Sequence, residues 1–310
     1  ESTTELDHIL KQRLIDLSQL KRLLRETRAL PRQYRPIVWK LLLGVQPVYR
    51  DVAAFVLSQQ EETYQDLKSA LVVVLSSRER DLFAANKNNQ ETLSRAEYYL
   101  YIYQFQHESL DDFSSLSSVN RREKINATQY APAAQVFAKV FSSQVSEGYW
   151  CFEAFVSQSR HTTEIPAMEK IMQRLRTALQ RAHPKLVEYL ENRCMTIDKF
   201  VCHWLHSCFT CILPHFLLVV VWDLLLSSQN VDTLKVAVCL FILAEKEKYT
   251  FELIDSTKLF QFLIDQPLTL SSSSSLSSTQ QQQQMINYAL DQIEKKIIMI
   301  TKKSINCNLK

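Results

Sequence analysis

Glycine is almost absent from this sequence of 310 residues. Only Gly44 and Gly148 occur, whereas the usual share is roughly 7%. Phosphate-binding loops, tight hairpin turns and dinucleotide-binding turns need glycine where the backbone takes positive φ angles or approaches a ligand closely. The sequence therefore excludes a nucleotide site built on a glycine-rich loop.

The chain also lacks a strong excess of charge of one sign. It has 36 basic and 33 acidic residues, a net charge of +3, and the two signs alternate in stretches such as residues 78–81 and 245–248. Nucleic-acid binding is typical of clustered basic residues. Nucleic acid is therefore not an expected partner.

The sequence shows no signal peptide with a basic region followed by an apolar region, and the seven cysteines show no regular pairing. This pattern is typical of a reducing compartment and predicts a cytoplasmic protein. The most apolar run, residues 208–222, is interrupted by Pro214 and His215, whereas a bilayer span needs ~20 uninterrupted apolar residues. We expect a buried helix there and no transmembrane segment.

Apolar residues recur at helical spacing along nearly the whole chain. Residues 1–28 place them on one face and charged residues on the other, which predicts an amino-terminal amphipathic helix. A short helix is expected over residues 37–43, with Gly44 as its stop. Further helices are expected over residues 51–76, 91–106, 133–146, 149–159, 164–182, 184–192, 196–211, 216–227, 231–246, 256–265 and 285–302. No strand pattern competes, so the predicted fold class is all-α.

Three polar segments lack the apolar content to offset the entropy of ordering. They are residues 86–90, the serine-rich residues 109–118, and residues 271–284 with their serine and glutamine runs. We therefore expect a main domain over residues 29–266, a low-complexity insertion over 267–284, and a C-terminal helix over 285–310.

Several motifs resemble TBC domains in their order and spacing. They comprise the opening motif in residues 34–44, an aromatic segment in residues 148–153, and a C-terminal set; the motif residues are Arg35, Trp39, Gly44, Trp150, Trp204, Pro214, Trp222 and Asp223. The resemblance covers roughly residues 30–265 and implies a two-lobed helical array. Structural roles are favoured for these residues, and the alternatives are Arg35 as a functional cation and Asp223 as a catalytic acid.

Most TBC domains accelerate GTP hydrolysis by Rab-type GTPases with an arginine and a glutamine supplied in trans. The family arginine ends an Ile-x-x-Asp-x-x-Arg motif, and at that place this chain has Leu67, Ala70 and Val73. The glutamine belongs to a Tyr-x-Gln-Gly-Met motif, and near Tyr130 this chain has Gln135 with no glycine after it. The resemblance therefore implies that both finger motifs are degenerate.

Arg78 and Arg80 follow the degenerate arginine motif closely. Either guanidinium is a candidate for a displaced finger. The favoured interpretation is a solvated cluster of alternating charges at a helix end.

Five residues near the C-terminal motifs have spacings that metal sites use: Cys202, His203, His206, Cys208 and Cys211. Two of them stand one helical turn apart, and two form a C-x-x-C pair. The resemblance places them in a helix of the family core, where cysteine acts as a small apolar residue. We expect no metal and no cofactor.

Four tyrosines crowd the segment of residues 96–104. At about 100° per residue, Tyr98 and Tyr101 share one helix face, and Tyr99 and Tyr103 point to another. Since one face suffices for a core, the second is a candidate partner surface. The alternative is a helix buried on both faces.

Within the TBC family, residues 34–44 and 96–104 most resemble a branch that lacks the finger motifs and forms the third subunit of the hamartin–tuberin complex. This implies a non-catalytic adaptor that binds a coiled-coil protein resembling hamartin. A tuberin-like subunit would then activate a small GTPase of the Rab or Rheb type in TOR signalling, at endomembranes or the lysosome. The alternatives are an active Rab GTPase-activating protein with displaced catalytic residues, and a scaffold that binds a GTPase without turnover.

Overall fold

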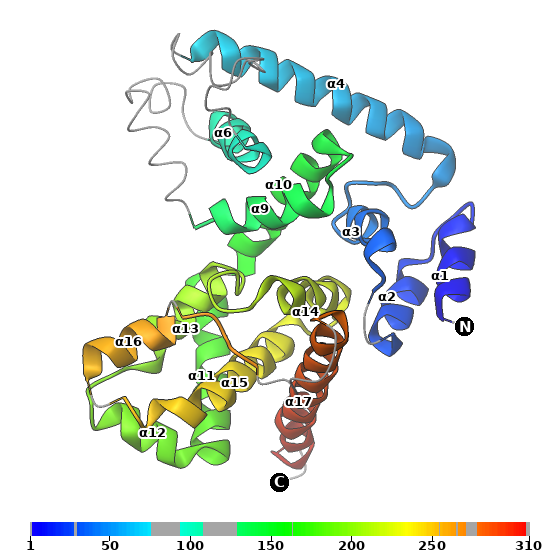
Figure 1. The fold of residues 1–310 in the computed structure, drawn as a ribbon. Coiled ribbons are helices and arrows are strands. Elements are labelled where there is room, and N and C mark those ends of the chain that lie inside the picture. The colour runs from blue at the N-terminus through cyan, green and yellow to red at the C-terminus, as the bar shows by residue number, and fades with distance from the viewer. Residues whose placement is uncertain are drawn as a thin grey trace. The chain divides into compact units, whose positions relative to one another are not determined.

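The computed structural model describes residues 2–27, 30–75, 94–107, 129–162, 164–253, 255–264, 266–270 and 278–307. Within these ranges the chain forms helices and no strand (Figure 1). One isolated bridge pairs Leu14 with Tyr49. The predicted all-α fold class is confirmed.

The chain divides into two compact units. Unit 1 comprises Glu1–Leu20 and Pro31–Gln158, and unit 2 comprises Lys21–Leu30 and Ser159–Lys310. The helices of unit 1 are α1 (Ser2–Lys11), the start of α2 (Leu17–Glu26), the 3-10 turn η1 (Arg32–Tyr34), α3 (Arg35–Leu42), α4 (Arg50–Val74), α6 (Arg95–His107), α9 (Ala131–Val140) and most of α10 (Val145–Thr162).

The amino-terminal segment forms two helices instead of the single predicted one. Between them, the backbone N–H of Ile15 donates to the Val48 carbonyl (3.0 Å), and that of Arg50 donates to the Arg13 carbonyl (3.0 Å). Asp16 then caps α2 by accepting from the backbone N–H of Ser18 at 2.8 Å. Long-range pairing and a side-chain cap thus override local helical periodicity here.

Aromatic rings fill the core of unit 1. α6 packs against both α4 and α9, and Phe137 on α9 lies 5.3 Å from Trp39 on α3 between ring centroids. Tyr149 on α10 contacts Tyr64 on α4 (5.5 Å) and Tyr99 on α6 (6.0 Å). These edge-on and tilted contacts are the favoured geometries for aromatic pairs.

The buried tyrosines should make unit 1 sensitive to alkali. Burial raises the pKa of Tyr64 to about 12, so the folded state keeps a proton that the unfolded chain releases near pH 10. This contribution to stability is complete below pH 10 and is lost as the pH rises toward 12. Each pH unit in this interval should therefore lower the unfolding free energy of the Tyr64→Phe variant by about 1.4 kcal/mol less than that of the parent chain.

Denaturant titrations of both proteins between these pH values, followed by circular dichroism, would measure the difference. Equal slopes for Tyr64→Phe and the parent chain would contradict the buried, neutral phenol.

Unit 2 is built around α15 (Val231–Thr250), whose middle residues Val236–Leu243 are all buried. α11, α14 and α17 pack against α15, and α13 packs against α16. The other helices of unit 2 are the remainder of α2 and α10, α11 (Ile165–Ala182), α12 (Pro184–Glu191), α13 (Ile197–His206), α14 (His215–Ser227), α16 (Ser256–Ile264) and α17 (Ser278–Cys307). No described helix is both long and apolar enough to cross a membrane.

Two predicted elements of unit 2 have different bounds. The helix expected over residues 196–211 ends at His206, because Cys208 and Phe209 take φ angles of 50° and 66°, outside the right-handed helical region. The glutamine run of residues 280–284, expected to be loose, lies within α17. Glutamine is a good helix former, and extending a helix costs less than nucleating one.

The remaining segments expected to be loose, residues 86–90, 109–118 and 271–275, lie outside the described residues.

Candidate functional site

The residues predicted to replace the family arginine motif, Leu67, Ala70 and Val73, lie on the last two turns of α4. Leu71 is fully buried and sets the rotation of the helix, so Ala70 and Val73 face solvent. The Val73 side chain is 78% exposed. A side chain at this position would be free to reach a docked protein, but an isopropyl group donates no hydrogen bond to a phosphate.

Gln135, at the degenerate glutamine motif, is exposed on α9, whereas its neighbours Ala134 and Phe137 are fully buried. Because α6 contacts both α4 and α9, the two motif positions lie on the two helices that pack against α6 (Figure 1). Arg78 and Arg80, the candidates for a displaced finger, lie outside the described residues.

The tyrosines of α6 are not available as a partner surface in this conformation. Tyr99 and Tyr101 are 0% exposed and Tyr103 is 3% exposed, whereas Tyr98 is half-buried. The Tyr99 hydroxyl donates to the Val145 carbonyl (2.8 Å). These three side chains are therefore buried in this structure, where α6 packs against α4 and α9 within unit 1.

The motif residues of unit 1 hold its helices together. Arg35 and Trp39 are buried on α3, and Gly44 ends this segment with a φ of +74°, where an L side chain would be strained. The indole N–H of Trp150 donates to the Gln60 carbonyl (2.9 Å). The indole contact connects α10 to α4.

The motif residues of unit 2 are equally enclosed. Trp204 donates to the Leu263 carbonyl (3.0 Å) and Trp222 donates to the Cys208 carbonyl (2.9 Å). Pro214 caps α14, and Asp223 is buried on the same helix. The indole contacts fix the ends of α13 and α16 within the unit.

The cysteines and histidines with metal-like spacing do not converge. Among the described residues, no group of three potential ligands lies close enough to hold a metal ion. The His206 Nδ1–H donates to the Cys202 carbonyl (2.6 Å), and the Cys211 thiol lies 3.0 Å from the Ser207 hydroxyl. Burial raises the pKa of the Cys208 thiol, which disfavours the thiolate that a metal requires.

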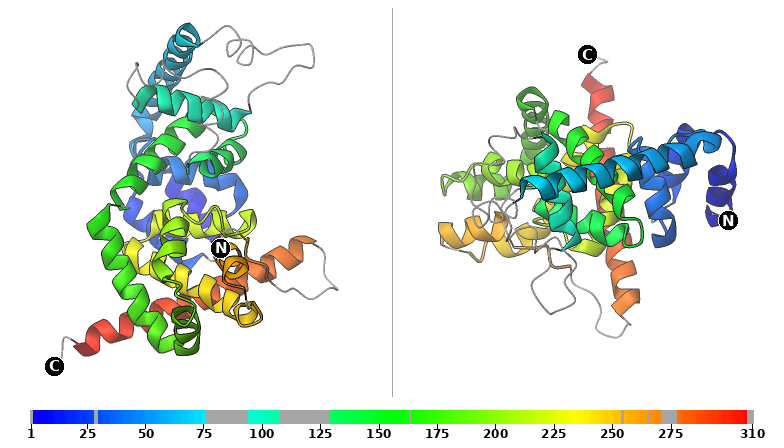
Figure 2. Two further views of the ribbon diagram at one scale, coloured as in Figure 1. Left: turned by 90° about the vertical axis from the view of Figure 1, so that its left-hand side faces the viewer. Right: turned by 90° about the horizontal axis from the view of Figure 1, so that it is seen from above.

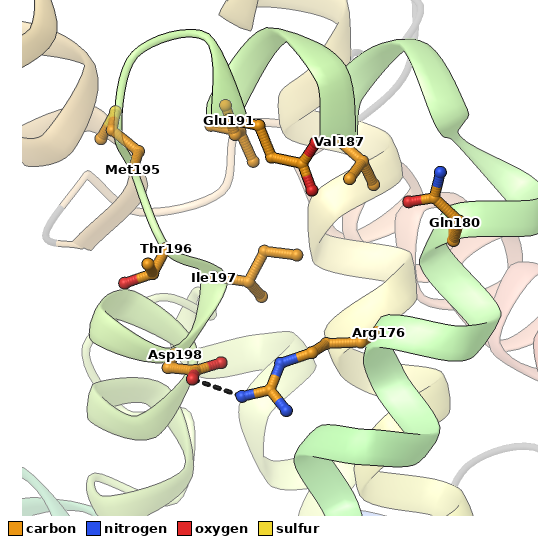
Figure 3. A pocket seen from close by; sticks show the side chains of 9 residues that line it. Arg176, Gln180, Val187, Glu191, Met195, Thr196, Ile197 and Asp198 are labelled. Atoms are coloured by element: carbon orange, nitrogen blue, oxygen red, sulfur yellow. Dashed lines mark hydrogen bonds and ion pairs between the residues drawn. The ribbon is translucent and has the colours of Figure 1, made fainter.

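Unit 2 contains a small pocket between α11 and the segment joining α12 to α13 (Figure 3). Its volume is 210 Å³, and Val187, Leu190 and Ile197 contribute apolar walls. The ion pair of Arg176 with Asp198 lies at its rim. This volume is below the ~300–1,000 Å³ of sites for drug-sized ligands, so the pocket is too small for a nucleotide.

Sequence reasoning missed an exposed stripe along α4, which we call the α4 stripe. Its seven members are spaced alternately by three and four residues and are all exposed: Val52, Phe55, Gln59, Glu62, Asp66, Ser69 and Val73. Leu14 and Tyr49, also exposed, adjoin the apolar end of the stripe. This spacing places the seven side chains on one face of the helix. It is visible in the sequence, but periodicity alone does not distinguish an exposed face from a buried one.

The sequence profile described as the Rab-GTPase-TBC domain matches residues 32–250. TBC1 domain family member 7 from Bos taurus is 25% identical over 237 residues, covering 74% of this chain and 71% of that protein. The protein of the same name from Homo sapiens is 28% identical over 209 residues, covering 64% of this chain and 62% of that protein. The crystal structure of the Ypt/Rab-GAP domain of Gyp1p superimposes with a TM-score of 0.63 at 16% identity, covering 96% of this chain and 97% of that one. The profile spans most of the chain and the helical fold agrees with it, so this protein belongs to the Rab-GTPase-TBC domain family.

Proposed function

We propose that this protein is a non-catalytic adaptor that uses its TBC domain to bind a coiled-coil partner resembling hamartin. In this proposal a tuberin-like subunit supplies the GTPase-activating residues for a small GTPase of the Rab or Rheb type in TOR signalling. The observation that carries it is the exposed aliphatic side chain of Val73, which the motif resemblance predicts in place of the family arginine. At this position the chain offers apolar surface and no guanidinium.

The α4 stripe supports a helical partner. Its apolar ends, Val52 with Phe55 and Val73, lie about 30 Å apart at 1.5 Å per residue. Glu62 and Asp66 occupy the middle of the stripe. A partner helix that matches this surface would carry apolar residues at both ends and basic residues between them, as in helix-in-groove and coiled-coil recognition.

The adaptor proposal predicts that the α4 stripe is required for partner binding. The Phe55→Ser/Val73→Ser variant should bind a hamartin-type coiled-coil fragment at least about tenfold more weakly than the parent chain, because truncating an apolar contact at each end of the stripe removes on the order of 1 kcal/mol each. Isothermal titration calorimetry with the purified chain would measure the loss.

Ile165→Ser is the matched control, since Ile165 is 83% exposed on α11 of unit 2. It should bind as the parent chain does. If the parent chain does not bind the coiled coil, or if both variants bind it with the affinity of the parent chain, the adaptor proposal fails.

Membership of the Rab-GTPase-TBC family keeps an active Rab GTPase-activating protein as the second candidate. Single-turnover GTP hydrolysis over a panel of Rab GTPases decides between the two, and the adaptor proposal expects no acceleration. Acceleration that disappears in Arg78→Ala or Arg80→Ala would establish a displaced finger. Nucleotide-dependent binding without acceleration would instead indicate a GTPase scaffold.

A further inference from the structure

The last sixteen residues of the chain carry a local excess of positive charge. Residues 295–310 contain five lysines and no acidic residue, whereas the whole chain has a net charge of only +3. The last acidic residues of α17 are Asp291 and Glu294. The alternation of charges seen elsewhere therefore stops before the C-terminal third of this helix.

The part of α17 before this segment is packed against unit 2. Ile286, Ala289, Leu290 and Ile293 are buried, and α17 contacts α15 and α14. Lys296 continues the attachment, since its Nζ lies 3.2 Å from Nε2 of His183. These contacts fix the rotation of α17 about its own axis.

Because of this rotation, two apolar residues near the C-terminal end of α17 point outward. Ile298 is 43% exposed and Met299 is 37% exposed. Together with the exposed Lys295 they occupy positions i, i+3 and i+4, which share one face of a helix. In both views of Figure 2 the C-terminal end of α17, in red, extends beyond the neighbouring helices of unit 2.

We propose that this face of α17, defined by Lys295, Ile298 and Met299, binds the surface of a membrane that contains anionic lipids. The two apolar side chains can enter the interface while the ammonium group of Lys295 stays at the level of the lipid phosphates. Lysines close to the membrane surface increase the affinity of a protein for an anionic leaflet, because the surface potential of that leaflet is negative.

A membrane surface fits this face better than a second helix does. A coiled-coil seam would need apolar residues to recur along the same face. One turn earlier, however, that side of α17 carries Asp291 and Glu294. The apolar patch is therefore short, and the lysine-rich sequence of residues 295–310 complements anionic lipid.

Vesicle co-sedimentation with the full chain tests the proposal. The chain should bind vesicles of phosphatidylcholine with about 30% phosphatidylserine, bind vesicles of phosphatidylcholine alone much more weakly, and dissociate as salt rises toward 0.5 M. The Lys295→Gln/Ile298→Ser/Lys302→Gln variant should lose at least about tenfold in partition onto the anionic vesicles.

A matched control removes the same groups from other exposed positions of unit 2, as Lys185→Gln/Ile165→Ser/Lys258→Gln, and should keep the partition of the parent chain within about twofold. Equal losses in both variants, or equal binding to neutral and anionic vesicles, would overturn the proposal. Dimerisation of the chain without lipid that the α17 variant abolishes would also overturn it, in favour of contact between copies. Since the α4 stripe is unchanged in both variants, coiled-coil binding is measured separately from lipid binding.

Discussion

Replacing Gly148 with alanine is expected to lower the unfolding free energy by about 3 kcal/mol, the upper part of the usual range for overpacking a core. A Cβ atom at this position would lie 2.3 Å from the Tyr99 hydroxyl and 2.7 Å from Cβ of Phe141. Neither neighbour can withdraw easily, because Tyr99 is fully buried and hydrogen-bonded to Val145 and Phe141 is 1% exposed. Urea denaturation followed by circular dichroism would measure the loss.

Gly44→Ala serves as the matched control. Nothing lies within 4 Å of a Cβ built at Gly44, and the strain there comes from its φ of +74° alone, so a cost of about 1 kcal/mol is expected. In an unobstructed helix, alanine in place of glycine would stabilise by up to about 1 kcal/mol. A gain in stability for Gly148→Ala would therefore contradict the close approach of α6 to α10.

The second large effect is expected at Lys40 and Glu147, which form an ion pair between α3 and α10. Lys40 is only 5% exposed, so Glu147→Ala would leave its ammonium group buried without this carboxylate. Removing one partner of a buried pair costs about 3–5 kcal/mol, and we expect the lower end because the Glu147 side chain is 20% exposed. Thermal and urea denaturation would measure the change.

Two further variants separate pairing from packing. Lys40→Met/Glu147→Leu should recover more than half of the loss, because it removes both charges and keeps apolar volume. Asp51→Ala breaks the exposed pair with Arg13, whose side chains are 84% and 57% exposed, and should cost less than about 1 kcal/mol. Similar losses for Glu147→Ala and Asp51→Ala would show that burial of Lys40 contributes nothing.

Several features of the candidate site could be predicted from the sequence because they depend on which residue is present and not on how it packs. The motif resemblance predicts a valine in place of the family arginine and a glutamine without a following glycine, and both expectations depend on residue identity alone. Burial could not be predicted in the same way. Tyr99 and Tyr103 were assigned to a partner surface, because periodicity shows that α6 has two apolar faces without showing what covers the second one.

The sequence by itself determined the helical fold class, the family and the scarcity of glycine, since periodicity, motif spacing and composition are properties of the chain alone. Only the tertiary structure decided which apolar faces are covered. It buried three of the four tyrosines of α6, left the α4 stripe exposed, split the amino-terminal helix at Asp16 and turned Ile298 outward on α17. The physical reason is that a helix buries the face against which another element packs, and that partner can come from a distant part of the sequence.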